Sequence, residues 1–364
     1  MKVPYTAFKM KNTQIRSQLI HAFEEVLDSG HYIQGPEVAN FEKEFATYCG
    51  AEFASGIANG TCSLHLTFRV IGVGKGDEVI TAPNSFIASA STIALAGARP
   101  VFVDVMDDLN MDPDKIEAAI TPRTKAIVPV HLAGRPAKMK QINEIAKRHG
   151  LFVLEDAAQS VGAELDGQRV GSLGDAASFS LHPLKNLHAF GDAGILTAKN
   201  LDLIKNLNIS KNHGLSNRDQ CDFWSFNCRL DELQASLLRI QLRELPRWTE
   251  ERRQLALRYH KLLKPFVQVP EEGNGEYHVY QTYVIQAERR DDLLIYLRKN
   301  DVEALVHYPT PIHMQPAARD LNYKPDDFPV TIALSNKIMS LPLYPGLSHE
   351  QQDYVALLIE NFYK

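Results

Sequence analysis

One lysine lies between a strand-like apolar run and a glycine-bearing bend, in the stretch 178–196 (SFSLHPLKNLHAFGDAGIL). The apolar run stops at Pro183, Lys185 follows in an irregular turn, and Gly191 and Gly194 bracket a bend into a second apolar run. A free lysine has a pKa of about 10.4, so its amine becomes a nucleophile only where a site desolvates it or binds it as an imine. The setting suggests Schiff-base chemistry at the mouth of a sheet, although a lysine extending from a turn into solvent fits the same pattern.

Two carboxylates, Glu155 and Asp156, end another apolar run, LFVLEDAAQS. Side chains alternate along a strand, so the two point to opposite sides and one of them faces the site. We expect a helix to follow, with Gln159 on the same helical face as Asp156. A plain helix-capping role for Asp156 explains the pattern equally well.

A glycine-bearing turn, Asn59-Gly60-Thr61, precedes a predicted helix. Free N–H groups and the positive end of the helix dipole suit a phosphate there, although Thr61 or Ser63 could simply cap the helix. The turn matches neither the dinucleotide-binding nor the P-loop glycine spacing. Phe86 follows a strand that ends at Thr81, and is either a flat platform for a ring or a core residue.

These features become more informative together, because ligands of open α/β sheets bind outside the carboxyl ends of the strands. A lysine for an imine, an acid for a pyridine nitrogen, an aromatic plate and a phosphate cup are the parts that hold pyridoxal phosphate. The sequence therefore predicts a pyridoxal-phosphate site.

The elements that position this site follow an α/β pattern between about residues 53 and 237, which indicates a mostly parallel sheet. A helix is expected over 136–149, where apolar residues recur at helical spacing. Several of the predicted strands are apolar on both faces, as buried strands are. They span 77–81, 100–105, 125–130, 151–155, 177–181 and 194–198.

A long helical pattern over 229–263 is interrupted only by Pro246, where we expect a kink or a break. We therefore predict a large α/β domain over 1–245 and a small α+β domain over 246–364. The small domain should contain strands at 277–286 and 303–307 and helices at 291–299 and 350–363.

Composition excludes several classes of function. A net charge of −5 over 364 residues argues against a nucleic-acid or anionic-membrane surface. The N-terminus lacks the apolar core of a signal peptide, and the weakly polar run 86–98 is too short and too hydroxylated to span a bilayer, so we expect a cytoplasmic protein. The four cysteines have no zinc spacing and are expected to be reduced, and no metal site is predicted.

Ordered motifs along nearly the whole chain make it resemble the DegT/DnrJ/EryC1/StrS family of sugar aminotransferases. Among them are GHYIQGPEVANFEKEFATYCG, LEDAAQSVGAELDGQRVGSLGDAASFS, HPLKNLHAFGDAG, NCRLDELQAS and HYPTPIHMQP. The resemblance implies the aspartate aminotransferase fold, pyridoxal 5′-phosphate as cofactor, and L-glutamate as amino donor. Because a branch of the family that dehydrates sugars replaces the lysine with histidine, Lys185 favours transamination.

The resemblance also implies roles for individual residues. Lys185 should bind the cofactor as a Schiff base and move the substrate proton, and Asp156 should pair with the pyridine nitrogen. Gln159 should contact the ring hydroxyl and Phe86 should cover a ring face. The phosphate should be held by the turn Gly60, Thr61 and Cys62, by Ser180, and by Asn227 from a neighbouring subunit, which requires a homodimer.

The family signatures look most like those of enzymes that aminate a nucleotide-linked 3-keto-6-deoxyhexose for lipopolysaccharide, O-antigen or glycoside biosynthesis. A free acidic keto sugar, such as an oxidised keto-deoxyoctulosonate that yields an 8-amino product, is the alternative. A sugar dehydratase and a non-catalytic regulator that binds the cofactor are weaker readings. Candidates for substrate contacts are Tyr32, His182, His188, His213, Arg229, His307, Tyr308 and His313, with Lys211 and Arg218 as further cations for a pyrophosphate.

Three departures from the family pattern border the expected site. Cys62 and Ser63 stand where many relatives have aspartate and alanine. Gln281 and Thr282 stand where many relatives have a histidine near Tyr280, and His182 and His188 stand where many relatives have aromatic or small residues.

Overall fold

The computed structural model describes residues 1–7 and 13–364, and a seven-stranded sheet lies at its centre. The strand order is β1-β9-β8-β5-β4-β2-β3. These strands are β1 (Phe53–Ile57), β2 (Glu78–Thr81), β3 (Arg99–Phe102), β4 (Thr124–Val128), β5 (Phe152–Asp156), β8 (Ala176–Ser180) and β9 (Gly194–Ala198).

The expected mostly parallel sheet is confirmed, since only β9 runs against its neighbours, β1 and β8. All six strands predicted in this region are present, with ends shifted by a few residues. The prediction missed β1. Its sequence, FASGI, carries a serine and a glycine and contains only one β-branched residue, so its strand signal is weak.

Helices cover both faces of this sheet, so its strands are apolar on both sides. One core cluster joins Ile80, Ile127 and Val153 to side chains from α2, α6 and α8. A second cluster, on the other face, joins Val79 and Leu154 to side chains from α3, α4 and α7. Adjacent residues of one strand thus enter different cores, and the result is a three-layer α/β/α arrangement.

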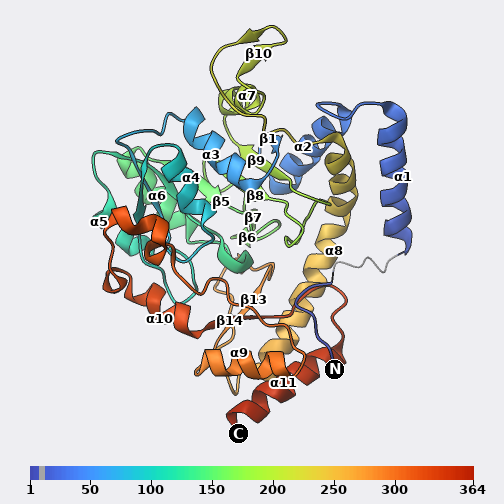
Figure 1. The fold of residues 1–364 in the computed structure, drawn as a ribbon, viewed down its shortest axis with the longest axis vertical. Coiled ribbons are helices and arrows are strands. Elements are labelled where there is room, and N and C mark those ends of the chain that lie inside the picture. The colour runs from blue at the N-terminus through green and yellow to red at the C-terminus, as the bar shows by residue number, and fades with distance from the viewer. Residues whose placement is uncertain (8–12) are drawn as a thin grey trace.

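Figure 1 shows the arrangement of the helices around the sheet. They are α1 (Thr13–Ser29), α2 (Pro36–Cys49), α3 (Gly60–Val70), α4 (Ala88–Leu95), α5 (Ile116–Ala119), α6 (Met139–His149), α7 (Leu201–Ser210), α8 (Glu232–Leu263), α9 (Arg290–Lys299), α10 (Pro329–Lys337) and α11 (His349–Tyr363). Short 3₁₀ turns cover Pro113–Lys115, Leu132–Gly134, Ile312–Met314, Pro316–Leu321 and Pro325–Asp327.

Small β elements complete the fold. Strands β6 (Glu164–Leu165) and β7 (Gln168–Arg169) form a three-stranded sheet with β12 (Glu276–Tyr277). Strands β10 (Leu215–Asn217) and β11 (Gln220–Cys221) form a hairpin that projects from the body at the end opposite both chain termini (Figure 1).

The C-terminal part has its own apolar core, built from α8, α9, α11 and the antiparallel pair β13 (Tyr283–Gln286) and β14 (Ile338–Leu341). The predicted helices at 291–299 and 350–363 correspond to α9 and α11. The predicted strand at 303–307 is wrong, because only Leu305 makes a β-bridge, with Ser340. Val3 packs into this core and pairs with Val302, so the first residues join the C-terminal part.

The predicted break at Pro246 does not occur. Helix α8 is continuous over 32 residues with Pro246 inside it. A proline removes one helical hydrogen bond, and burial of apolar side chains around it, such as Leu242 and Leu245, offsets that loss. The helix runs from the main sheet to the C-terminal core (Figure 1), so the proposed domain boundary falls within a helix and remains a prediction.

Within residues 1–7 and 13–364, no helix is long and apolar enough to cross a membrane. Over the same residues, the acidic, histidine and cysteine side chains form no group that could hold a metal ion.

Candidate active site

A cavity of about 590 Å³ opens where β5 and β8 end and α3 begins. It brings together most of the residues predicted for the cofactor, although they are far apart in sequence. From the predicted set it is lined by Gly60, Thr61, Cys62, Phe86, Asp156, Gln159, Ser180, His182, Lys185, His307 and Tyr308. The expected position, at the carboxyl ends of parallel strands, is the observed one.

Asp156 ends β5 and its buried carboxylate faces this cavity. Its Oδ2 accepts a hydrogen bond from Ser89 Oγ at 2.7 Å, and Ser85 Oγ donates to Ser89 Oγ at 2.9 Å. The helix expected after Asp156 is absent, because residues 157–160 form a turn in which the Ser160 N–H donates to the Ala157 carbonyl. Asp156 is therefore not a helix cap.

Glu155 points to the opposite side, as strand alternation requires. Its carboxylate is fully buried and accepts hydrogen bonds from the backbone N–H groups of Gly171, Leu173 and Gly174. It also lies 3.0 Å from His131 Nε2. Glu155 therefore anchors a loop, and Asp156 is the acid left to the cavity.

Gln159 is held at both ends of its amide. Its Oε1 accepts from the Ala133 N–H at 2.8 Å, and its Nε2 donates to Tyr308 Oη at 3.3 Å. The Tyr308 ring lies 5.8 Å from that of Phe86, which is 55% exposed. Phe86 is thus a cavity-wall residue rather than a core residue, and one face of its ring is available to a ligand.

The first turn of α3 forms a close-fitting cup. Asn59 caps the helix, accepting from the Cys62 N–H at 2.8 Å, so that donor is occupied. No acceptor within the described residues takes the N–H groups of Gly60 and Thr61. A Cβ at Gly60 would lie 3.0 Å from Ser180 Cβ, so the glycine allows a close approach between the start of α3 and Ser180. Two free donors beside a serine at a helix N-terminus suit a phosphate.

The environment of Lys185 changes its basicity. Burial lowers the pKa of Lys185 to about 8, against the opposing attraction of the Asp156 carboxylate. Its backbone N–H donates to the His182 carbonyl at 2.8 Å, which closes the turn. Burial and the nearby Lys185 charge lower the pKa of His307 to about 4, so that imidazole is neutral at neutral pH. Lys185 thus supplies an amine that titrates near the physiological range.

Several predicted substrate residues, and the predicted phosphate ligand Asn227, lie outside this cavity. Tyr32, His213 and Asn227 are exposed, and Arg229 Nη1 donates to Asn212 Oδ1 at 3.1 Å. His188 is next to the Lys185 turn and His313 is buried against Phe328, with ring centroids 4.8 Å apart.

The prediction that Lys211 binds a pyrophosphate is wrong. Its buried Nζ donates to Ser55 Oγ at 2.8 Å and to the Gly56 carbonyl at 2.9 Å, and pairs with Glu42 at 3.3 Å. These contacts tie α7 to β1 and α2, so Lys211 is structural and is not free to bind a pyrophosphate.

Sequence reasoning missed Ser89 and Ala133. Ser89 lies in the hydroxyl-rich run 86–98, and the unusual number of serines there is the only local signal for it. Ala133 contributes a backbone N–H, which no residue type reveals.

The fold and this cavity define a pyridoxal-phosphate-dependent aminotransferase. The chain belongs to the DegT/DnrJ/EryC1/StrS aminotransferase family, whose model matches residues 13–360.

Individual relatives cover almost the full chain. It is 41% identical to a "Pleiotropic regulatory protein" of Geobacillus stearothermophilus, covering 100% of this chain and 99% of the relative. It is 40% identical to the "dTDP-3-amino-3,6-dideoxy-alpha-D-galactopyranose transaminase" of Aneurinibacillus thermoaerophilus, covering 99% of each. The crystal structure of S. venezuelae DesV in complex with a ketimine intermediate matches with a TM-score of 0.97 and 37% identity, over 100% of this chain and 99% of that one.

The protein is a sugar aminotransferase, and its cofactor is pyridoxal phosphate. The cavity fits that cofactor on its own geometry. A glycine-walled cup with two free N–H groups suits the phosphate, the buried Asp156 suits the pyridine nitrogen, and Lys185 suits the aldehyde.

The lowered pKa of Lys185 makes cofactor attachment depend on pH. Only the neutral amine attacks a carbonyl, so attachment should become faster as pH rises and level off above about pH 8. Below that, the rate should fall about tenfold per pH unit. Stopped-flow absorbance of the cofactor-free protein mixed with pyridoxal phosphate measures this. A rate still rising toward pH 10 would show an ordinary, solvated lysine.

Proposed function

We propose that this enzyme transfers the amino group of L-glutamate to the 3-keto group of a nucleotide-linked 6-deoxyhexose. The observation that carries this proposal is the cavity in which Lys185 and Asp156 face one space beside a free phosphate cup. The transaminase of Aneurinibacillus thermoaerophilus, named for a dTDP-linked 3-amino-3,6-dideoxy sugar, supports the choice of substrate. We further propose that the product enters lipopolysaccharide, O-antigen or glycoside biosynthesis.

The chain's own residues then have distinct tasks. The bound cofactor supplies an electron sink for the electron pair left at the substrate carbon. Asp156 would pair with the ring nitrogen and favour its protonated form, and the Ser89 hydroxyl orients the Asp156 carboxylate by donating to Oδ2. Gln159 and Phe86 line the same cavity as Asp156 and would help to orient the ring. The Lys185 amine accepts and returns the substrate proton at its Nζ, and its pKa near 8 suits both directions at neutral pH.

We also propose a homodimer with shared active sites. Asn227 is exposed and lies outside its own chain's cavity, so only a second copy could bring it to a phosphate cup. Near it, Phe223, Trp224 and Phe226 are exposed around the β10–β11 hairpin, Trp224 at 89%. An exposed cluster of large aromatic side chains is typical of an interface. Cytoplasmic location stays a prediction from the sequence.

A panel of keto sugars tests the substrate. The enzyme loaded with cofactor is incubated with L-glutamate and each candidate, and products are read by mass spectrometry. We expect an amino product and 2-oxoglutarate only with a dTDP- or UDP-linked 3-keto-6-deoxyhexose. In the same panel, amination of a free acidic keto sugar would replace this substrate with the alternative.

A regulator is the second candidate, because the first relative described above is named a pleiotropic regulatory protein. A protein that only binds the cofactor gains nothing from an amine with a pKa near 8 beside a buried carboxylate. Binding of cofactor without any amino transfer across the panel would favour the regulator. A 3-deoxy product without amine incorporation would favour a dehydratase.

A further inference from the structure

We propose that Gln281 is a positioning residue that fixes the backbone of Lys185. Its Oε1 accepts a hydrogen bond from the Asn186 N–H at 2.8 Å, and its Nε2 donates to the Leu184 carbonyl at 2.8 Å. A single side-chain amide therefore bonds to the peptide groups on both sides of Lys185. This inference rests on the proposed catalytic role of Lys185.

The loop around Lys185 needs such support. Residues 181–193 contain neither helix nor strand, so no ladder of backbone hydrogen bonds fixes them. Within the loop, the Lys185 N–H bonds to the His182 carbonyl and the Ala189 N–H to the Leu181 carbonyl. These bonds close the turn but do not attach it to the rest of the molecule.

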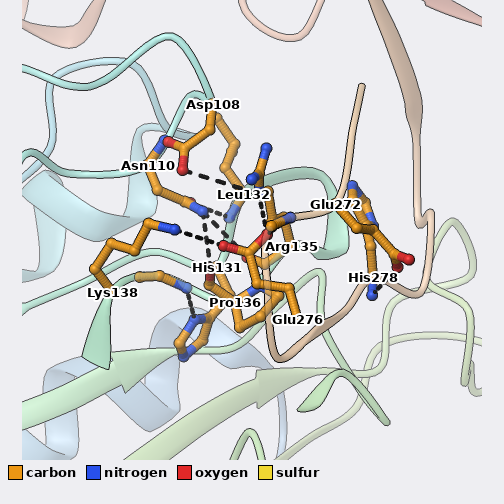
Figure 2. Close-up of polar contacts among 12 residues, drawn as sticks. Asp108, Asn110, His131, Leu132, Arg135, Pro136, Lys138, Glu272, Glu276 and His278 are labelled. Carbon is orange, nitrogen blue, oxygen red and sulfur yellow. Dashed lines mark hydrogen bonds and ion pairs between the residues drawn. The ribbon is translucent and has the colours of Figure 1, made fainter. Parts of the chain in front are cut away.

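Gln281 reaches the loop from a segment that is itself fixed. Glu276 accepts from Arg135 at 2.7 Å and from Lys138 at 2.6 Å, and Figure 2 shows its carboxylate between these two cations. Further along, the Val279 N–H donates to the Gly134 carbonyl at 3.1 Å. We call residues 276–282 the bridging segment, because it joins the C-terminal part to the 131–138 turn.

The 131–138 turn is rigid in its own right. Asn110 Oδ1 accepts from the Leu132 N–H at 3.1 Å, and its Nδ2 donates to the Pro136 carbonyl at 3.2 Å. His131 Nδ1 accepts from the Ala137 N–H at 2.9 Å (Figure 2). Because three hydrogen bonds hold this turn, the bridging segment is attached to a fixed part of the fold.

The 131–138 turn also connects the bridging segment to Gln159. The Thr282 N–H donates to the Ala133 carbonyl at 3.3 Å, and the Ala133 N–H donates to Gln159 Oε1. The bridging segment therefore holds two separate parts of the cavity, the Gln159 amide and the Lys185 loop. From the opposite side, Asn186 Nδ2 donates to the Val161 carbonyl at 3.0 Å. Farther along the loop, Gln234 and Gln241 of α8 bond to the backbone at residues 190 and 188, so Gln281 and Asn186 provide the anchors nearest to Lys185.

Fixing the backbone matters because the lysine side chain is long and flexible. Its Nζ must meet both the cofactor and the substrate proton, and a displacement of about 1 Å can cost about 100-fold in rate. A rigid backbone on both sides of Lys185 limits the positions that Nζ can take. Gln281 thus acts on the rate of the proton transfer rather than on substrate affinity.

The test compares two identical substitutions, Gln281→Met and Gln286→Met. Methionine has a similar length and no hydrogen-bonding amide. Gln286 is the matched control, because it is half-buried in the same part of the fold and its Nε2 also donates to a distant backbone carbonyl, that of Asp107 at 3.2 Å. Within the described part of the chain, the Gln286 side chain forms no hydrogen bond to residues 181–193.

The first readout does not need activity. Hydrogen exchange of the cofactor-free protein, followed by mass spectrometry, reports the N–H groups of the Lys185 loop. Losing the acceptor for the Asn186 N–H should speed exchange in peptides covering 184–187 about fivefold to tenfold in Gln281→Met. Gln286→Met should exchange there like the wild type. Unchanged exchange in Gln281→Met would overturn the proposal, whatever the substrate proves to be.

The second readout is kinetic. With cofactor and L-glutamate, the half-reaction of Gln281→Met should have a rate constant lower by about 10- to 100-fold, while the glutamate concentration for half-maximal rate stays within about twofold. Gln286→Met should match the wild type in both. Faster exchange together with an unchanged rate constant would show that Gln281 orders the loop without positioning Lys185, and would overturn the inference.

Discussion

Lys185→Ala should reduce transamination by at least on the order of 10³-fold while leaving a folded protein. No other lysine lines the described cavity, and the neighbouring His307 has a pKa near 4, too weak a base to replace an amine with a pKa near 8. The substitution therefore removes the amine that accepts the substrate proton in the proposed mechanism. Steady-state release of 2-oxoglutarate measures the loss.

The matched control is Lys205→Ala. Lys205 is exposed on α7 and pairs weakly with Asp202 at 3.4 Å, so its removal should leave turnover and melting temperature unchanged. A Lys185→Ala protein that melts like the wild type but still turns over at a comparable rate would disprove the assigned role.

Asp156→Asn should lower turnover by on the order of 10²–10³-fold and retain part of the cofactor. The amide has nearly the same shape, so the phosphate cup and the Ser89 hydroxyl can still be satisfied. It carries no charge, however, and so no longer stabilises a protonated ring nitrogen. Single-turnover kinetics with L-glutamate give the rate, and gel filtration followed by an absorbance spectrum gives the retained cofactor.

Ser89→Ala provides a graded comparison for that variant. It keeps the Asp156 carboxylate but removes the 2.7 Å hydrogen bond to it, so the rate should fall between those of wild type and Asp156→Asn. Wild-type turnover in Asp156→Asn would mean that another group protonates the ring. Glu155 is not available for that purpose, since three backbone N–H groups and His131 surround its carboxylate.

Most of the fold could be predicted because its signals are local. The central strands are short apolar runs between turn residues, and burial on both faces makes each run continuous. The errors arose where tertiary packing overrides local preference. Strand β1 contains Ser55 and Gly56, and becomes a strand by pairing with β9. Pro246 stays inside α8 because the helix packs on both cores.

In the candidate site, too, residues with a local sequence signal could be predicted and residues placed by tertiary packing could not. Lys185, Asp156 and Gly60 each carry a local signal, because Asp156 ends β5, Gly60 begins α3 and Lys185 lies in the turn that follows β8. The residues that hold these three side chains in place carry no such local signal. Ser89 is 67 positions from Asp156, and Gln281 is 95 from Asn186, so only the folded chain brings these partners together. The burial of Lys211 could not be predicted either, because it depends on tertiary packing and the sequence around an exposed lysine can look the same as that around a buried one.

The most direct measurement is an absorbance spectrum of the protein loaded with pyridoxal phosphate, before and after addition of L-glutamate. A visible band from cofactor bound at Lys185 should form, and glutamate should bleach it as the cofactor takes up the amino group. The band should be absent in Lys185→Ala loaded in the same way. A wild-type protein that forms no such band, or whose band is unchanged by L-glutamate and by other amino donors, would contradict the assignment of Lys185 as the catalytic lysine of an aminotransferase.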